Sequence, residues 1–119
     1  MANNEIKLFF NRAPLSLNKL FRMHWSKRKV EEDTWPHKVH AHWLEIQRPV
    51  FLKPVRIEYT IFFDSNRDRD YDNYIGGTKM ITDALRRTFI TRDDAKWLKG
   101  ININFENSKE GTLISIREA

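Results

Sequence analysis

The chain contains no cysteine. This absence excludes disulfide frameworks, thiolate metal sites and cysteine nucleophiles, so any bound metal must be held by oxygen or imidazole ligands. The sequence also has no apolar run as long as a membrane span, and its N-terminal segment MANNEIKLFF has neither the basic region nor the long apolar region of a signal peptide. We therefore expect a cytoplasmic protein with no membrane partner.

Internal repeats, low-complexity tracts and interdomain linkers are absent as well. A chain of 119 residues is long enough for one hydrophobic core and too short for two, so we expect a single domain over residues 1–119. Basic residues outnumber acidic ones, with 21 Lys and Arg against 16 Asp and Glu. An excess of positive charge suits a polyanionic partner such as nucleic acid, although many basic proteins bind none.

The hydrophobic pattern of the first half predicts two strands and an intervening helix. Residues 5–10 (EIKLFF) and 54–63 (PVRIEYTIFF) alternate apolar and polar side chains in the manner of half-buried strands. Between them, residues 11–22 contain a proline and are expected to form an exposed loop, whereas residues 26–47 have helical spacing. Pro36 leaves two interpretations: the main helix begins shortly before the proline, or a longer helix kinks there.

The second half of the chain predicts one helix and two strands. The helix follows Asp72 and extends to about Arg87, with a pair of glycines near its beginning. Residues 99–106 (KGININFE) and 111–118 (GTLISIRE) are expected to pair as a hairpin through the turn NSKEG. The expected fold class is therefore α+β, a small single domain in which a mixed sheet packs against two main helices.

Acidic residues gather directly after the second predicted strand, in the segment RDRDYDNYIGGTK (residues 67–79). Asp70 and Asp72 have Asp-x-Asp spacing, which brings two carboxylates close enough for their repulsion to favour a divalent cation. The alternative is a solvated loop in which Arg67 and Arg69 neutralise these acids. The spacing fits neither an EF-hand loop, nor a P-loop, nor a phosphatase Asp-x-Asp-x-Thr motif.

A longer pattern, RDYDNYIGGTKMITDALRRTFITRDDAKW (residues 69–97), resembles the signature of the RusA family of Holliday junction resolvases. That signature is Asp-x-Asp-Asn, a lysine, Asp-Ala-Leu on a helix, and a later Asp-Asp pair. The segments APLSLNKLFRMHW (residues 13–25) and KEGTLISI (residues 109–116) resemble the family's Pro-x-Ser-x-Asn segment and its closing strand. The resemblance covers nearly the whole chain. It implies a RusA-like fold and a location in the cytoplasm of a bacterial or phage-infected cell.

The resemblance also implies the roles of particular residues. It assigns metal binding and catalysis to Asp70, Asp72 and Asp94, with Mg²⁺ as the cofactor and Mn²⁺ as a substitute. It gives a further catalytic role to Lys79, which stands four residues before Asp83 as in the family. Three additional residues precede this lysine, and a Gly-Gly bulge at the start of the helix is expected to absorb them.

The chemistry of this residue set suits phosphodiester hydrolysis. Carboxylates are the hard oxygen ligands that Mg²⁺ prefers, and bound Mg²⁺ can activate water and neutralise charge at a phosphate. Lys79 would add a fixed positive charge facing the scissile phosphate. Its structural alternative is a surface ion pair with Asp83, one helical turn away, and the two roles are compatible.

Contacts with DNA phosphates are expected from basic side chains in NKLFRMHWSKRK (residues 18–29) and around the proposed metal site. These DNA-binding residues are Lys19, Arg22, Lys27, Arg28, Arg69 and Arg92. Phe21 and Trp25 lie in the same segment and have two interpretations. They stack on unpaired bases, or they anchor the segment to the core, and the large area that aromatic side chains bury favours the second.

The resemblance thus implies a structure-selective endodeoxyribonuclease that resolves four-way DNA junctions in recombination and repair. Because two opposed strands must be cut, one site per subunit implies a homodimer. One alternative is a nuclease of the same fold that acts on other branched DNA. Another is a non-catalytic branched-DNA-binding module, which lost turnover through the insertion before Lys79, and a third is an architectural protein that folds DNA crossings without chemistry.

Overall fold

The computed structural model describes residues 5–65, 71–90 and 97–119, and at positions 71, 72, 75 and 76 it describes the backbone. Within these residues the elements follow in the order β1 (Glu5–Phe10), α1 (Leu17–Arg22), α2 (Trp25–Glu45), β2 (Val55–Phe63), α3 (Tyr71–Leu85), β3 (Leu98–Asn107) and β4 (Gly111–Glu118). The predicted class is confirmed at this level, since the protein is a small α+β structure with a mixed sheet and helices.

The chain divides into two compact units, each assembled from separate segments. The sheet unit comprises Met1–Pro14, Phe51–Arg69 and Arg92–Ala119. The helical unit comprises Leu15–Val50 and Asp70–Thr91.

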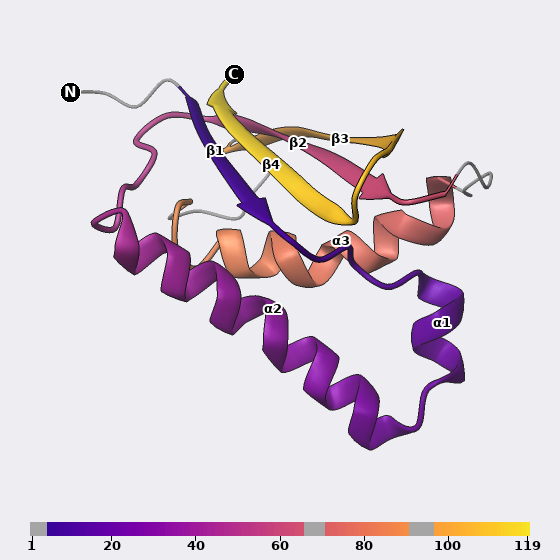
Figure 1. The fold of residues 1–119 in the computed structure, drawn as a ribbon. Coiled ribbons are helices and arrows are strands. Elements are labelled where there is room, and N and C mark those ends of the chain that lie inside the picture. Colours follow the sequence, from indigo (N-terminus) through magenta and orange to yellow (C-terminus); the bar gives the residue numbers. More distant parts are fainter. Residues whose placement is uncertain (1–4, 66–70, 91–96) are drawn as a thin grey trace. The chain divides into compact units, whose positions relative to one another are not determined.

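The sheet unit is built on four strands in the order β1-β4-β2-β3 (Figure 1). β4 pairs antiparallel with both β1 and β2, whereas β3 runs parallel to β2. Alternation along β2 buries Val55, Ile57, Tyr59 and Ile61, each at most 1% exposed. β-Branched and aromatic side chains pack well on a pleated, buried surface, so this alternation suits the central place that β2 occupies.

The hairpin predicted for the last two strands is wrong. β3 and β4 are joined by a short connection, but β2 lies between them in the sheet. The backbone N–H of Ser108 donates to the carbonyl oxygen of Phe63 at 3.0 Å, where this connection passes the end of β2. The connection between β3 and β4 has the length of a hairpin turn. However, β2 buries its apolar face more completely than β3 does. The central position therefore goes to β2, which has hydrogen-bonded neighbours along both edges.

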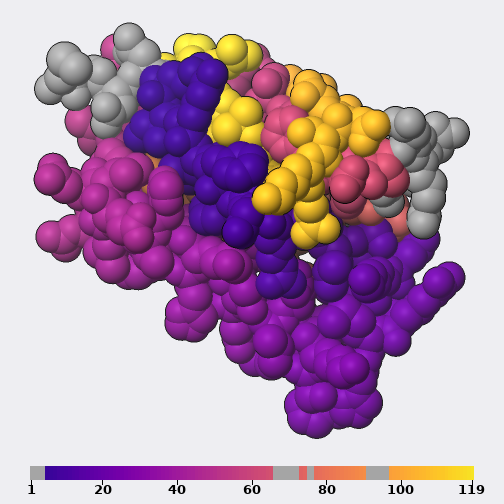
Figure 2. Space-filling view, in the orientation of Figure 1, coloured from indigo at the N-terminus to yellow at the C-terminus, as the bar shows by residue number. Residues whose placement is uncertain are grey.

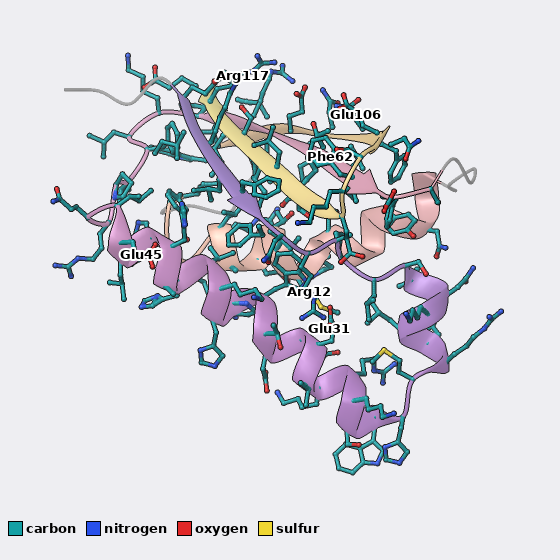
Figure 3. The ribbon with its side chains drawn as sticks, viewed as in Figure 1. Arg12, Glu31, Glu45, Phe62, Glu106 and Arg117 are labelled. Carbon is teal, nitrogen blue, oxygen red and sulfur yellow. The ribbon has the colours of Figure 1, made fainter. Side chains whose placement is uncertain are left out.

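The opposite face of the sheet carries an aromatic pair that spans three strands. Phe9 of β1 and Phe62 of β2 lie on either side of β4, with ring centroids 6.5 Å apart. A Cβ atom on Gly111 of β4 would lie 2.7 Å from Cζ of Phe9. The missing side chain at Gly111 therefore lets rings from two strands meet across a third. On its other side Phe62 has Glu106 of β3 as its register partner (Figure 3).

The helical unit begins with α1, which replaces part of the expected loop. The hydroxyl of Ser16 accepts a hydrogen bond from the N–H of Lys19 at 3.2 Å, and the side-chain oxygen of Asn73 accepts one from the N–H of Asn18 at 2.9 Å. The first N–H groups of a helix have no partner inside the helix, so both bonds stabilise α1. The loop prediction is wrong for residues 17–22 because one cap comes from α3, 55 residues away along the chain.

α2 is one continuous helix from Trp25 to Glu45 with Pro36 in its interior. The interpretation in which the helix begins just before the proline is therefore wrong, and the longer helix is the one observed. Trp35 is fully buried, and the ring of Trp43 packs edge-on against Phe89 with centroids 6.5 Å apart. Within the part of the chain that the structure describes, no helix is long and apolar enough to cross a membrane.

Candidate nucleic-acid and metal site

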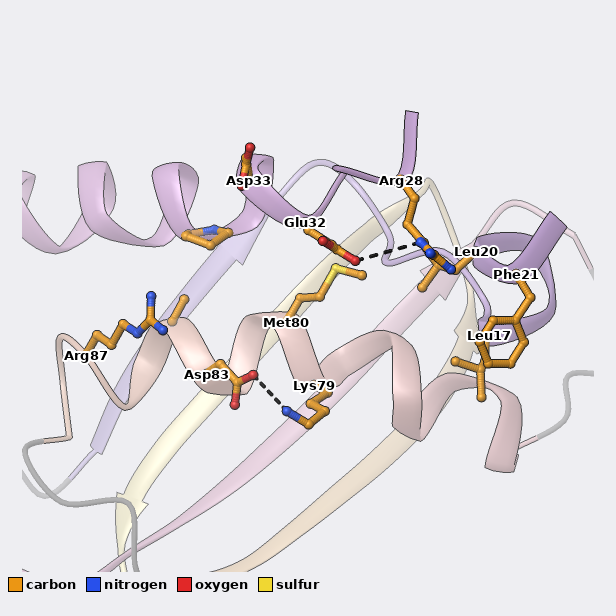
Figure 4. Close-up of a pocket in the computed structure, with 12 residues that line it drawn as sticks. Leu17, Leu20, Phe21, Arg28, Glu32, Asp33, Lys79, Met80, Asp83 and Arg87 are labelled. Atoms are coloured by element: carbon orange, nitrogen blue, oxygen red, sulfur yellow. Dashed lines mark hydrogen bonds and ion pairs between the residues drawn. The ribbon is translucent and has the colours of Figure 1, made fainter. Parts of the chain in front are cut away.

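α3 has one buried side and one exposed side. Ile81, Ala84 and Leu85 lie on the buried side at helical spacing. Lys79 and Asp83 lie on the exposed side, where Nζ of Lys79 is 3.0 Å from Oδ2 of Asp83 (Figure 4). The predicted ion pair is confirmed. Because 73% of the Lys79 side chain is exposed, the pair contributes little to stability, and the ammonium group stays accessible to a ligand.

The backbone of α3 relates Lys79 to the first acidic pair. Asp72 is the second residue of α3 and precedes Lys79 by two helical turns, so the two positions lie on the same side of the helix, about 10 Å apart along its axis. The expected Gly-Gly bulge at the start of this helix is wrong. Gly76 and Gly77 lie inside an uninterrupted helix, and no glycine among the described residues has positive φ. The residues between Asn73 and Lys79 are helical.

Most of the proposed metal ligands lie outside the described residues. This holds for Asp70 and Asp94 and for the side chain of Asp72. Arg69 and Arg92, which were predicted to bind DNA, also lie outside the described residues. The convergence of the three aspartates stays a prediction, whereas the chemistry of the donor set fits Mg²⁺, because it consists of carboxylate oxygens alone. Within residues 5–65, 71–90 and 97–119, no three His, Asp or Glu side chains are grouped as a metal site would require.

Asn73 is a site residue to which sequence reasoning gave no role of its own. It follows Asp72 directly, and its side chain holds the N-terminus of α1 through the bond to the N–H of Asn18. Two of the three segments that carry the resemblance, residues 13–25 and 69–97, therefore meet at Asn18 and Asn73. The sequence signals the start of α1 rather than this contact, because Ser16 stands three residues before Lys19, the spacing between a helix N-cap and the N–H that its side chain accepts.

A cavity of about 450 Å³ is present in the helical unit (Figure 4). Its walls are six apolar residues, three cations and three carboxylates: Leu17, Leu20, Phe21, Pro36, Met80, Ala84, Arg28, Lys79, Arg87, Glu32, Asp33 and Asp83. Arg28 Nε lies 3.9 Å from Glu32 Oε1, so part of this charge is paired internally. Sequence spacing could not reveal the cavity, since its walls come from three different helices.

The basic segment of residues 18–29 forms α1 and the first turn of α2. Lys19, Arg22 and Lys27 are exposed and form no ion pair with any described residue. Phe21 is 68% exposed and Trp25 is 70% exposed. The interpretation in which these rings anchor the segment to the core is therefore wrong. Figure 2 shows the surface of α1 and early α2 in violet.

Comparison with known proteins finds no family model that matches this chain and no curated protein that matches it.

Proposed function

We propose that this protein is a Mg²⁺-dependent, structure-selective endodeoxyribonuclease that resolves Holliday junctions in recombination and repair, with a RusA-like fold. The observation that carries the proposal is the geometry of α3. Lys79 stands exposed on the side of the helix where the backbone of Asp72 lies, opposite the buried side. A cation and an acidic position that share an exposed helix side are suited to act on one phosphate group.

The insertion before Lys79 is compatible with that role. In the resemblance the lysine follows the Asp-Asn pair after two residues, and here it follows after five. Because α3 is helical throughout, three additional residues turn the lysine by about 300° and move it about 4.5 Å along the axis. The lysine thus returns to nearly the same side of the helix, which an insertion of one or two residues would not achieve.

The roles of the residues follow from their chemistry. Asp70, Asp72 and Asp94 would hold the metal, which when bound supplies an activated water and neutralises charge on the phosphate. The ammonium of Lys79 would stabilise negative charge that grows on the phosphate oxygens. Lys19, Arg22, Lys27 and Arg28, together with Arg69 and Arg92, would contact the phosphates of the DNA arms. A homodimer would cut both opposed strands.

The proposal is tested by cleavage of defined DNA substrates. Purified protein is incubated with a synthetic four-way junction, a linear duplex and a flap, each with Mg²⁺, Mn²⁺ or EDTA. The proposal requires symmetric cuts in the junction with either metal and none with EDTA. Cleavage of the flap alone would instead support a nuclease of the same fold that acts on other branched DNA.

Asp70→Asn should abolish cleavage while leaving junction binding intact, because the substitution removes a charged ligand with little change in shape. Asp33→Asn is the matched control: Asp33 is an exposed carboxylate on α2, paired with Lys29 at 3.3 Å. Gel-shift binding and single-turnover cleavage should be measured for both variants. Normal cleavage by Asp70→Asn would contradict the metal assignment.

A second candidate, a non-catalytic module that binds branched DNA, is favoured by the ion pair that occupies Lys79. In such a module the lysine would serve only to bind Asp83, and the additional residues before it would have displaced it from a working site. Junction binding without cleavage under every metal condition would support this candidate. An architectural protein would also bind without cleavage, and its affinity would be the same with Mg²⁺ and with EDTA.

A further inference from the structure

The positive charge of the chain is concentrated in one short segment. Residues 18–29 contain five Lys and Arg and no Asp or Glu, and the formal net charge of the whole chain is +5. The rest of the chain is therefore balanced in charge. This segment, which we call the α1–α2 corner, consists of α1 from Asn18, its connection to α2, and the first residues of α2.

Among the described residues, the α1–α2 corner also holds the two most exposed rings of Phe, Tyr or Trp. Phe21 lies in the last turn of α1 and is 68% exposed, and Trp25 is the first residue of α2 and is 70% exposed. Aromatic side chains bury large areas in cores and interfaces, and exposed apolar groups that form a patch rimmed by polar residues mark interaction surfaces. The combination of rings with unpaired cations matches the way proteins bind single-stranded nucleic acid, where bases stack on rings and cations contact phosphates.

Local structure holds Trp25 in place at this corner. Nδ1 of His24 accepts the N–H of Ser26 at 3.2 Å and so caps α2, and the His24 ring lies 5.5 Å from the Trp25 ring, centroid to centroid. Arg28 and Lys29 follow Trp25 by three and four residues, so they lie on its side of α2. Both are ion-paired within α2, Arg28 with Glu32 at 3.9 Å and Lys29 with Asp33 at 3.3 Å. The cations of the corner that form no ion pair with any described residue are Lys19, Arg22 and Lys27.

Negative charge next to the corner limits the width of an anionic ligand that can bind there. Glu32 and Asp33 follow one turn later on α2, and both are exposed. An anionic surface laid along the helix, such as a lipid bilayer, would meet these carboxylates, whereas a narrow strand crossing the corner would avoid them.

We propose that the α1–α2 corner binds unpaired nucleotides, with bases stacked on Phe21 and Trp25 and phosphates contacted by Lys19, Arg22 and Lys27. The inference rests on the proposed function in taking DNA as the ligand. It extends that function by naming the feature of branched DNA that is recognised, the unpaired segment at the branch point. The corner itself contains no carboxylate, so its binding needs no metal.

The test measures binding to a fluorescein-labelled oligothymidylate of about 12 nucleotides, in EDTA, by anisotropy. Trp25→Leu keeps an apolar side chain without a ring, and Phe21→Leu does the same at the second position. Each should weaken binding about 5- to 150-fold, while Trp25→Phe should retain most of the affinity because it retains a ring. Leu44→Ala, at the other end of α2 and 49% exposed, is the matched control and should bind as the unsubstituted protein does.

Intrinsic fluorescence gives a second readout. Of the four tryptophans, Trp35 is fully buried, Trp43 and Trp97 are half-buried, and Trp25 is 70% exposed. Quenching by the oligothymidylate should therefore come mainly from Trp25 and should be mostly lost in Trp25→Phe. Unchanged affinity of Trp25→Leu would overturn the inference. So would equal affinity for a matched duplex, or binding to vesicles of phosphatidylserine and phosphatidylcholine without binding to the oligothymidylate.

Failure of the proposed function would look different. If the oligothymidylate binds as expected but the four-way junction is not cut with Mg²⁺, the nuclease proposal is wrong and nucleotide binding by the corner is supported. If the junction is cut and Trp25→Leu binds the oligothymidylate normally, nucleotide binding by the corner is wrong and the nuclease proposal is supported. Circular dichroism of each variant confirms that the fold is retained.

Discussion

Lys79 has two possible anionic partners, the Asp83 carboxylate on its own helix and a phosphate brought by a substrate. Lys79→Gln removes the charge, and if the ammonium stabilises the transition state, the cleavage rate at saturating junction should fall about 10²- to 10³-fold. Thermal stability should change little, because the ion pair is exposed. Single-turnover kinetics and a thermal melt measure both quantities.

Asp83→Asn is the control for that substitution. It breaks the same ion pair at 3.0 Å but leaves the ammonium in place. The cleavage rate should therefore stay within a few-fold of the unsubstituted value. If both variants lose activity equally, the ion pair itself is what the site needs, and the direct role of Lys79 is wrong.

Gly111 provides a prediction about the sheet. Gly111→Ala places a Cβ 2.7 Å from Cζ of Phe9 and 3.1 Å from the carbonyl oxygen of Phe10. The ring must move away and lose its contact with Phe62, so we expect a loss of about 1 kcal/mol in the free energy of unfolding. In a Phe9→Ala background the same substitution should cost less, because the ring it displaces is gone. Urea unfolding of the four proteins in this cycle measures the difference, and additive costs would contradict the contact.

At the scale of single elements, the periodicity of apolar residues predicted the strands and helices whose formation depends on nearby residues. The strands at 5–10, 54–63 and 111–118 and the helix carrying Lys79 and Asp83 were expected from alternation and from helical spacing, and the structure confirms them. Pro36 was harder to interpret, because a proline predicts a helix boundary but α2 continues through it. Packing of Trp35 and Val39 stabilises a helix that local preference would interrupt.

α1 is the element that depends most on its caps. It has six residues, so its own hydrogen bonds stabilise it little, and Ser16 and Asn73 satisfy two of its first N–H groups. Ser16→Ala should lower the free energy of unfolding by about 1 kcal/mol, and Ser16→Thr should restore most of it. Chemical denaturation checks both values. Equal stability of Ser16→Ala and the unsubstituted protein would show that the bond from Asn18 to Asn73 is sufficient.

At the scale of the whole molecule, the chain passes four times between the sheet unit and the helical unit. Neither unit is a continuous segment, so neither can complete its core without chain from both halves of the sequence. We therefore expect a single unfolding transition, as the prediction of one domain over residues 1–119 requires. Calorimetry should give equal calorimetric and van't Hoff enthalpies, and two resolved transitions would contradict the single domain.

Features that repeat along one segment could be predicted from the sequence: the apolar alternation of β2, the helical stripe of α3 and the ion pair between Lys79 and Asp83. They follow from the backbone geometry of strands and helices, which repeats every two or 3.6 residues and so relates near neighbours in the chain. Only the folded structure shows that β2 lies between β3 and β4, that Asn73 caps α1, and that Phe21 and Trp25 are exposed. Each of these depends on which distant segments meet, and no period along the chain encodes that choice.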